Sequence, residues 1–228
     1  MKINFGKALV GRNTLGKDIN IDLHTYLNND NCNILTVGAP GVGKTTTVKN
    51  RLKQLVDDVN TKIIIVTDHV KEYAKLSKSE NATLISMDEL QNNYTSTSDI
   101  IRKQINVNYI SDIETWLIYD YHGELEDRIV DFISTTLAFA RVHNCIVNIV
   151  VRSINELHST CLSNISVFEI FKPSADDLHF DGLSKIMQGK QLDSMKVKVK
   201  YLDRFKKIFI FKGNKILLNN WGHYEKNL

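Results

Sequence analysis

The stretch Asn33-Ile34-Leu35-Thr36-Val37-Gly38-Ala39-Pro40-Gly41-Val42-Gly43-Lys44-Thr45-Thr46-Thr47 decides the fold. It begins with an apolar run that is typical of a buried strand, passes through a glycine-rich turn and ends in a segment that favours a helix. From Gly38 to Thr45 it matches G-x-x-x-x-G-K-[ST], the motif of a phosphate-binding loop. Because strand, loop and helix follow in the order that this motif requires, we interpret the stretch as a nucleoside triphosphate site.

The chemistry of a triphosphate explains the spacing of this loop. Glycines let the backbone wrap around phosphates with its N–H groups pointing inward, and the helix that starts near Lys44 places its positive end beneath them. Lys44 is expected to reach the β- and γ-phosphates, and the Thr45 hydroxyl to hold Mg²⁺. The residues predicted to contact the nucleotide are Gly38, Ala39, Pro40, Gly41, Val42, Gly43, Lys44, Thr45 and Thr46.

Length and composition indicate an ordinary globular protein. The chain has 228 residues, which suits one α/β domain with small additions, and 43% of them are hydrophobic. A run of about 18 apolar residues, as a transmembrane helix needs, is absent, and the amino terminus does not resemble a signal peptide. Three scattered cysteines, Cys32, Cys145 and Cys161, show no C-x-x-C spacing, so we expect reduced thiols in a cytoplasmic protein and no zinc site.

Positive charge is concentrated near the carboxyl terminus. Residues 190–228 contain ten lysine and arginine residues against three acidic ones, a net charge of +7, whereas the whole chain carries +3. Such a basic segment on a near-neutral body fits a polyanionic partner, although lysines that only solvate a surface give the same pattern.

Strand-like and helix-like segments alternate after the loop. Apolar runs at 62–67, 83–86, 115–119, 145–151 and 167–171 predict strands, and a helix is expected between about 125 and 143. Directly after the loop, a helical stripe of Val48, Leu52, Leu55, Val56 and Val59 is expected. The pattern predicts an α/β fold with a doubly wound, mostly parallel sheet, in which a single domain comprises amino-terminal strands (1–32), a motor core (33–172), and a basic helix and hairpin (173–228).

A second nucleotide-site signature follows at Thr115-Trp116-Leu117-Ile118-Tyr119-Asp120. An apolar strand that ends in an aspartate delivers a carboxylate to the magnesium shell of phosphate-loop proteins. We therefore predict that Thr45 and Asp120 together form the Mg²⁺ site. His122 and His143 are expected to be surface or hydrogen-bonded histidines and not ligands.

Three segments resemble the FtsK/HerA superfamily of DNA-pumping ATPases. Leu15-Gly16-Lys17-Asp18-Ile19 with Ile21-Asp22-Leu23 is similar to the lead-in of that family, and Ile64-Ile65-Val66-Thr67-Asp68-His69-Val70-Lys71-Glu72-Tyr73 is similar to its I-I-D-P-H-G-E-Y segment. Residues 137–150 resemble the helix, arginine and strand that precede its polar sensor. The resemblance covers residues 9–172.

The resemblance implies an ATPase that requires ATP and Mg²⁺, moves double-stranded DNA and assembles into a homo-oligomeric ring of about five or six subunits. Single-core members of this size resemble viral genome-packaging ATPases, so we expect packaging into a preformed capsid in the host cytoplasm, possible attachment to the virion and a capsid or membrane vertex protein as docking partner. A HerA-like or conjugation-type pump of a plasmid or cell is the alternative.

The sequence departs from the family at the group that activates water. The family has Asp-Glu where this chain has Asp120-Tyr121, so Glu124 is the nearest substitute, with Glu72 and Asp68 as other candidates. Arg152 falls at the sensor position, where it would contact the γ-phosphate or form a structural ion pair. Arg141 matches an arginine that acts across subunits, but a cation at a helix carboxyl end also complements the helix dipole.

Other classes of nucleotide-binding protein fit less well. Asp120-Tyr121-His122-Gly123 matches the D-x-x-G motif of GTPases, but Asn214-Lys215-Ile216-Leu217 lacks the aspartate of N-K-x-D that would read guanine. A small-molecule kinase would need an arginine-rich lid, and residues 88–112 offer only Arg102 and Lys103. A nucleotide-bound assembly protein that does not hydrolyse ATP stays open, because the activating glutamate is missing.

Overall fold

The computed structural model describes residues 7–12, 18–22, 33–140, 142–174, 181–186, 188–204, 206–211 and 215–219. The strands are β1 (Lys7–Arg12), β2 (Asp18–Asp22), β3 (Ile34–Val37), β4 (Thr61–Thr67), β5 (Ala82–Ser86), β6 (Glu114–Asp120), β7 (Cys145–Val151), β8 (Val167–Phe171), β9 (Lys207–Phe211) and β10 (Lys215–Asn219). The α-helices are α2 (Lys44–Leu52), α3 (Val70–Tyr73), α4 (Met87–Asn92), α5 (Tyr94–Ile110), α6 (Asp127–Phe139), α7 (Ser159–Ser163) and α8 (Gly189–Lys200). Short 3₁₀ turns are η1 (Leu76–Lys78), η2 (Ile154–Glu156) and η4 (Asp181–Lys185).

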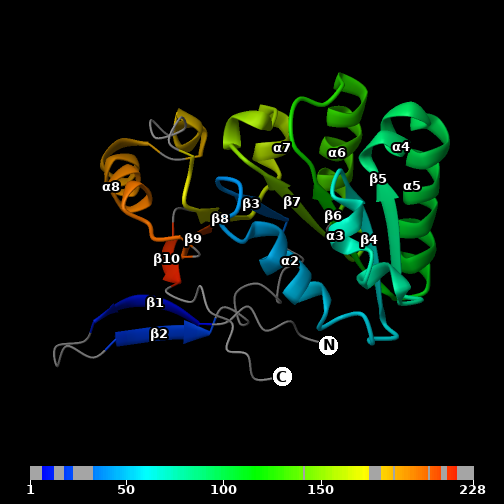
Figure 1. The fold of residues 1–228 in the computed structure, drawn as a ribbon, viewed down its shortest axis with the longest axis horizontal. Helices are drawn as coiled ribbons and strands as arrows, with labels where there is room; N and C mark the ends of the chain where they lie inside the picture. The colour runs from blue at the N-terminus through cyan, green and yellow to red at the C-terminus, as the bar shows by residue number, and fades with distance from the viewer. Residues whose placement is uncertain are drawn as a thin grey trace.

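The described strands form one sheet in the order β2-β1-β10-β9-β8-β3-β7-β6-β4-β5 (Figure 1). Strands from β8 to β5 in this order pair in parallel, and those from β8 outward to β2 pair antiparallel. The predicted mostly parallel, doubly wound sheet is confirmed. The predicted carboxyl-terminal hairpin is formed by β9 and β10, and it extends the sheet beside β8.

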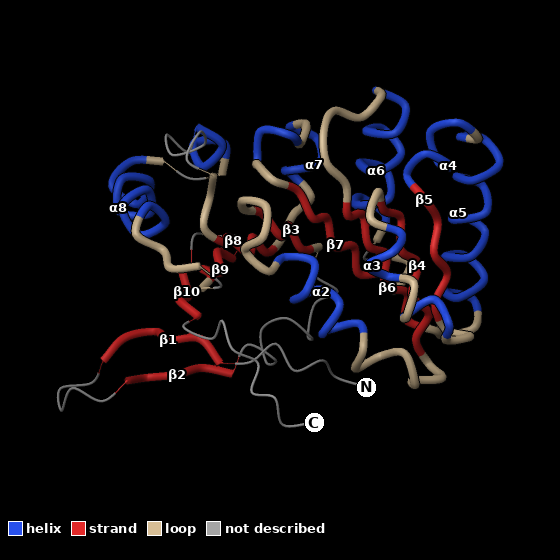
Figure 2. Tube along the Cα trace, in the orientation of Figure 1, coloured by secondary structure: helices blue, strands red, loops and turns tan. Residues whose placement is uncertain are grey.

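Helices cover both faces of the parallel half, which explains why its strands are apolar throughout (Figure 2). On one face α2, with Val48 and Leu52, packs on Ile63, Ile65 and Trp116. On the other face a larger cluster joins the sheet to α4, α5, α6, α7 and α8. The carboxyl ends of these parallel strands therefore converge at one edge between two packed layers, where α/β proteins place ligands.

Two sequence expectations about helices need correction. The helix after the phosphate loop ends at Leu52 and continues as turns, so Val59, which we expected on its buried stripe, is 76% exposed. These turns end at Asp57, before Val59, and the Asp58 side chain accepts a hydrogen bond from the Asn60 backbone N–H at 3.0 Å. The helix expected at about 125–143 is shorter, because it runs from Asp127 to Phe139.

A charged network lies inside the sheet, beneath the helix that follows the phosphate loop. Glu169 on β8 is fully buried and accepts hydrogen bonds from Arg51 of α2, from Lys207 of β9 at 2.5 Å and from the Thr36 hydroxyl at 2.9 Å. Burial by itself raises the pKa of Glu169, but the charges of Arg51 and Lys207 outweigh it and hold the pKa at about 2. Burial lowers the pKa of Lys207 to about 8, despite the attraction of Glu169. The network ties α2 to β8 and β9.

Candidate nucleotide-binding site

The phosphate loop leaves β3 at Val37 and enters α2 at Lys44. Gly41 has φ +74° and Gly43, the N-cap of α2, has φ +98°, a left-handed conformation that favours glycine. At Gly38 the constraint is also steric, since a Cβ there would lie 2.7 Å from the Cβ of Phe171 on β8. The Ala39 N–H donates to the Lys172 carbonyl at 2.8 Å, so the end of β8 supports the loop.

Lys44 folds back over the loop that precedes it. Its ammonium group donates to the Gly38 carbonyl at 2.6 Å and to the Ala39 carbonyl at 3.0 Å, and the side chain is buried. Burial lowers its pKa, while the negative charges of Asp120 and Glu156 act in the opposite direction. The cation thus lies inside the loop that a phosphate would occupy, between the loop and the carboxylate on β6.

Asp120 reaches the loop from two strands away, because β7 separates β3 from β6. Adjacent strands are about 4.8 Å apart, so side chains must span a gap of roughly 10 Å. The Thr45 hydroxyl donates to Asp120 Oδ2 at 3.0 Å, and the Tyr73 hydroxyl donates to the same oxygen at 2.7 Å. Asp120 is completely buried, and its Oδ1 has no hydrogen-bond partner among the described residues. Burial raises its pKa, which the hydrogen bonds from Tyr73 and Thr45 partly offset.

The loops after β4 and β6 are tied to one another beside Asp120. The Asp68 N–H donates to the Asp120 carbonyl at 3.2 Å, and the His122 N–H donates to Asp68 Oδ2 at 2.8 Å. The rings of His69 and His122 lie with their centroids 4.5 Å apart. Burial, together with the positive charge of Arg152, lowers the pKa of His122 to about 4, so this imidazole is neutral at physiological pH.

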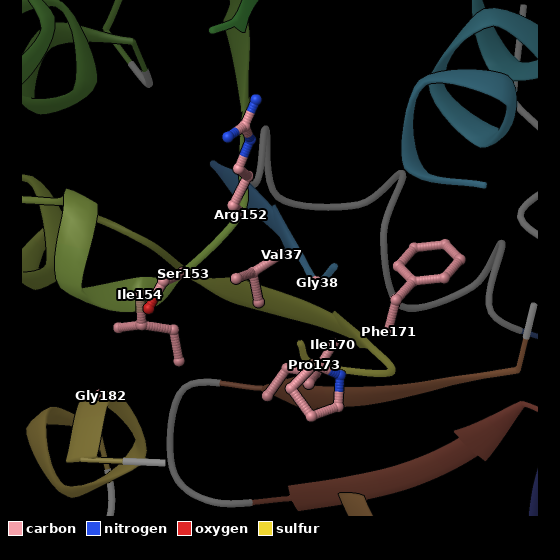
Figure 3. Close-up of a pocket in the computed structure, with 9 residues that line it drawn as sticks. All are labelled: Val37, Gly38, Arg152, Ser153, Ile154, Ile170, Phe171, Pro173 and Gly182. Atoms are coloured by element: carbon pink, nitrogen blue, oxygen red, sulfur yellow. The ribbon is translucent and has the colours of Figure 1, made fainter. Parts of the chain in front are cut away.

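Arg152 and Glu156 flank the site at the end of β7. Glu156 accepts the backbone N–H groups of Arg152, at 3.3 Å, and of Ser153, at 3.1 Å, in a capping box around η2. Figure 3 shows the exposed Arg152 side chain extending away from the apolar residues around Pro173. The charges of Arg152 and Glu156 both act on Lys44, so the two residues lie within electrostatic range of the loop.

Glu124, the residue predicted to activate water, makes no hydrogen bond to the residues of the phosphate loop. Glu124 lies on the exposed loop between β6 and α6, next to Gly123 with φ +98°, and no hydrogen bond connects it to Lys44, Thr45 or Asp120. Tyr121, which occupies the position of the expected glutamate, is buried in the core. Arg141 lies outside the described residues.

Two residues at the site were not assigned roles by sequence reasoning. Tyr73 belongs to the family-like segment, yet nothing in the pattern predicts its hydrogen bond to Asp120 across 47 positions. Arg204, between α8 and β9, donates from Nε and Nη2 to the Gly41 carbonyl at 3.3 and 3.2 Å, across 163 positions. No local sequence signal could have indicated that the basic carboxyl-terminal segment reaches the phosphate loop.

We expect Arg204→Ala to weaken nucleotide binding by about 2- to 10-fold, the effect of losing roughly 0.5–1.5 kcal/mol of hydrogen bonding. The reason is that the Gly41 backbone loses the contact that helps to hold the loop. Calorimetric titration with a non-hydrolysable ATP analogue measures the change. Lys206→Ala is the matched control, because Lys206 pairs with Asp203 at the surface. Equal affinities of the two variants would contradict a positioning role for Arg204.

Neither described cavity is an alternative nucleotide site. The pocket in Figure 3 lies behind the loop, is lined largely by apolar residues such as Val37, Ile154 and Ile170, and has a volume of about 10 Å³, room for roughly one water molecule. A cavity of about 250 Å³ lies between α5 and α6 near Cys145, where β7 begins, and thus at the opposite edge of the sheet from the phosphate loop.

Fold and loop together define a P-loop ATPase, since a mostly parallel sheet carries a phosphate loop whose threonine contacts a buried strand-end aspartate. Residues 10–223 match the family described as "Helicase HerA, central domain", and the chain belongs to that family. The resemblance to FtsK/HerA ATPases is confirmed. No protein in the curated collection matches the sequence.

Solved structures show the same fold. The genome packaging NTPase B204 from Sulfolobus turreted icosahedral virus 2, in complex with AMP, matches with a TM-score of 0.60 and 12% identity over 83% of this chain and 96% of its own. The DNA-packaging ATPase B204 from Sulfolobus Turreted Icosahedral Virus gives 0.60 and 13% over 84% and 98%. EssC (ATPases 2 and 3) from Geobacillus thermodenitrificans gives 0.59 and 12%, over 98% of this chain but 45% of EssC. At sequence identities of 12–13%, these matches show a shared fold and no more.

Within the described ranges, none of the helices is both long enough and apolar enough to cross a bilayer.

Proposed function

We propose that this protein is an ATP-driven translocase of double-stranded DNA that packages a viral genome into a preformed capsid. The observation that carries ATP use is the contact between the Thr45 hydroxyl and the buried Asp120, with Lys44 folded into the same loop. Membership of the HerA central-domain family and the fold shared with two packaging ATPases support DNA as the substrate.

The residues present fit a bound Mg²⁺ ion. Mg²⁺ prefers oxygen ligands, and the site offers two of them side by side, the Thr45 hydroxyl and the Asp120 Oδ2 that accepts its hydrogen bond. In this proposal Thr45 and Asp120 would hold the ion, which would neutralise negative charge on the phosphates, and Lys44 would bind the β- and γ-phosphates together with backbone N–H groups of residues 41–46. Burial of Lys44 and Asp120 strengthens these interactions by excluding water.

Completion of the site is proposed to require movement and a neighbouring subunit. Glu124 is our candidate for activating water, and its exposed loop would have to close toward the phosphates. In a ring of about five or six subunits, Arg141 or the exposed Arg152 of a neighbour would stabilise charge on the transferred phosphoryl group. A capsid or membrane vertex protein would dock the ring in the host cytoplasm.

The exposed lysines of α8 are the proposed contact with DNA. Lys190, Lys198 and Lys200 are exposed on this helix, while Met195 and Val199 turn inward to the core. Exposed lysines contact phosphates without reading sequence, and each such contact makes binding salt-dependent. Arg204 follows this helix and touches the phosphate loop, so DNA contact and the nucleotide site lie on one continuous segment.

We expect double-stranded DNA to stimulate ATP hydrolysis, with a binding affinity that falls as salt rises. Lys198→Ala combined with Lys200→Ala should reduce the slope of log affinity against log salt by about two, roughly 0.9 per lost phosphate contact. Lys75→Ala combined with Lys78→Ala removes two exposed lysines near η1 and serves as the charge-matched control. Turnover titrated with DNA and salt, and oligomer mass in the same sample, are the measurements.

Each outcome separates the candidate functions. Hydrolysis that DNA does not stimulate would contradict the translocase. No hydrolysis with or without DNA would instead support a nucleotide-bound assembly protein, for which the buried Tyr121 in place of the activating glutamate is the favouring observation.

A further inference from the structure

Two histidines and an aspartate form a group at the carboxyl ends of β4 and β6 that the proposed ATP site does not use in full. His69 follows β4, Asp120 ends β6 and His122 comes two residues later. One potential ligand atom from each of the three residues lies within 4.8 Å of the other two. The sequence analysis predicts that His122 is a surface or hydrogen-bonded residue, because a lone histidine in a sequence does not indicate a metal ligand.

Two potential ligand atoms of this group have no hydrogen-bond partner among the described residues. Asp120 is completely buried, and its Oδ2 is engaged by Thr45 and Tyr73, whereas its Oδ1 has no partner in the described part of the chain. His122 Nδ1 is likewise buried without a hydrogen bond there. Buried polar atoms are almost always satisfied, so two unsatisfied atoms within one group of potential ligands indicate a missing ligand.

The surrounding backbone holds the group in place without using the imidazole nitrogens. The His69 N–H donates to the Thr67 hydroxyl at 2.9 Å, and the His122 N–H donates to Asp68 Oδ2 at 2.8 Å. Thr67 is paired in register with Asp120 between parallel strands, which fixes the spacing of the two loops. These two contacts use no imidazole nitrogen, and His122 Nδ1 has no hydrogen-bond partner among the described residues.

We propose that His69, Asp120 and His122 bind a divalent first-row transition metal ion, separately from the oxygen-ligated Mg²⁺ expected beside Thr45. Two imidazoles and one carboxylate suit zinc, cobalt, iron or nickel, whereas Mg²⁺ and Ca²⁺ favour oxygen alone. An ion bound at about 2.0–2.2 Å from each ligand atom draws these atoms closer than 4.8 Å, which side-chain rotation supplies. Three protein ligands leave an open coordination position, which water or a phosphate oxygen fills.

Titration of the nucleotide-free protein with Co²⁺ tests this site, because cobalt with nitrogen ligands gives visible absorption. One ion per chain is expected, and a millimolar excess of Mg²⁺ should not displace it. His69→Ala and His122→Ala should each lower the affinity more than about 10-fold, since even the loss of an outer partner of a ligand costs about 10- to 100-fold. His143→Ala, in the turn that follows α6, is the matched control.

Three results would overturn the site: no cobalt binding, equal binding by the two histidine variants and the control, or displacement by equimolar Mg²⁺. Where an alanine variant does not fold, His122→Asn replaces it and should also lower the affinity. In the wild-type protein, the NMR signals of the His69 and His122 rings should shift during titration with Zn²⁺. The measurement contains neither nucleotide nor DNA, so its failure leaves the translocase proposal standing, and absence of ATP hydrolysis leaves the metal site standing.

Discussion

Lys44→Ala is expected to lower ATP hydrolysis by at least about 10²- to 10³-fold, the cost of removing one preorganised charge from a transition state in a water-excluded site. Lys44 is buried inside the phosphate loop, where its ammonium group donates to two loop carbonyls. When phosphates enter, the same group is placed to neutralise the charge that develops on the transferred phosphoryl group. Steady-state phosphate release, measured at saturating ATP, gives the change.

The fold should survive this substitution, because the truncated side chain removes a buried cation and no apolar packing. Far-ultraviolet circular dichroism and the thermal midpoint check this point. Lys53→Ala is the matched control, since Lys53 is an exposed lysine at the carboxyl end of the same helix. Retained hydrolysis in Lys44→Ala would disprove the site. Lost hydrolysis together with lost folding would leave Thr45→Ala as the second variant.

Local sequence patterns predict the buried strands, the phosphate loop and the aspartate at the end of β6. The continuous apolar runs of β4 and β7 predict strands buried on both faces, and glycine spacing predicts the loop because few other residues adopt its φ angles. Asp120 was identified from its place at a strand end, and the structure brings it to Thr45. Helix ends were less predictable, since α6 ends at Phe139 where the pattern continues.

Contacts between distant segments could not be read from the chain. Tyr73, Arg204 and the paired rings of His69 and His122 meet the site only because particular strands are neighbours in the sheet. Glu169 gives the clearest case: its strand reads as an ordinary apolar run, while the cations that neutralise it lie 118 and 38 positions away. Hydrophobic periodicity carries no information about such pairs.

Glu169→Gln is expected to lower the free energy of unfolding by about 3–5 kcal/mol, the usual cost of breaking a buried ion pair from one side. The substitution keeps the size of the side chain but removes the negative charge that Arg51 and Lys207 both contact in the interior. Urea denaturation followed by circular dichroism measures the change. Asp203→Asn, which breaks the exposed pair with Lys206, should change stability little.

The pH dependence distinguishes a lost charge interaction from lost packing. The folded-state pKa of Glu169 is about 2, below its ordinary 4.5, so its contribution is complete above pH 4.5 and is lost as pH falls toward 2. The difference in the free energy of unfolding between wild type and Glu169→Gln should therefore become smaller in that pH window.

Lys207 has a folded-state pKa of about 8, below its ordinary 10.5, so the unfolded wild-type chain binds more protons between these values and stability rises with pH there. Without Glu169 the pKa of Lys207 falls further, and the variant should gain stability from a lower pH than the wild type does. If the difference in unfolding free energy between wild type and Glu169→Gln stays constant from acid to alkaline pH, Glu169 acts through packing alone. The claim that charge interactions of Glu169 tie α2 to β8 and β9 would then be wrong.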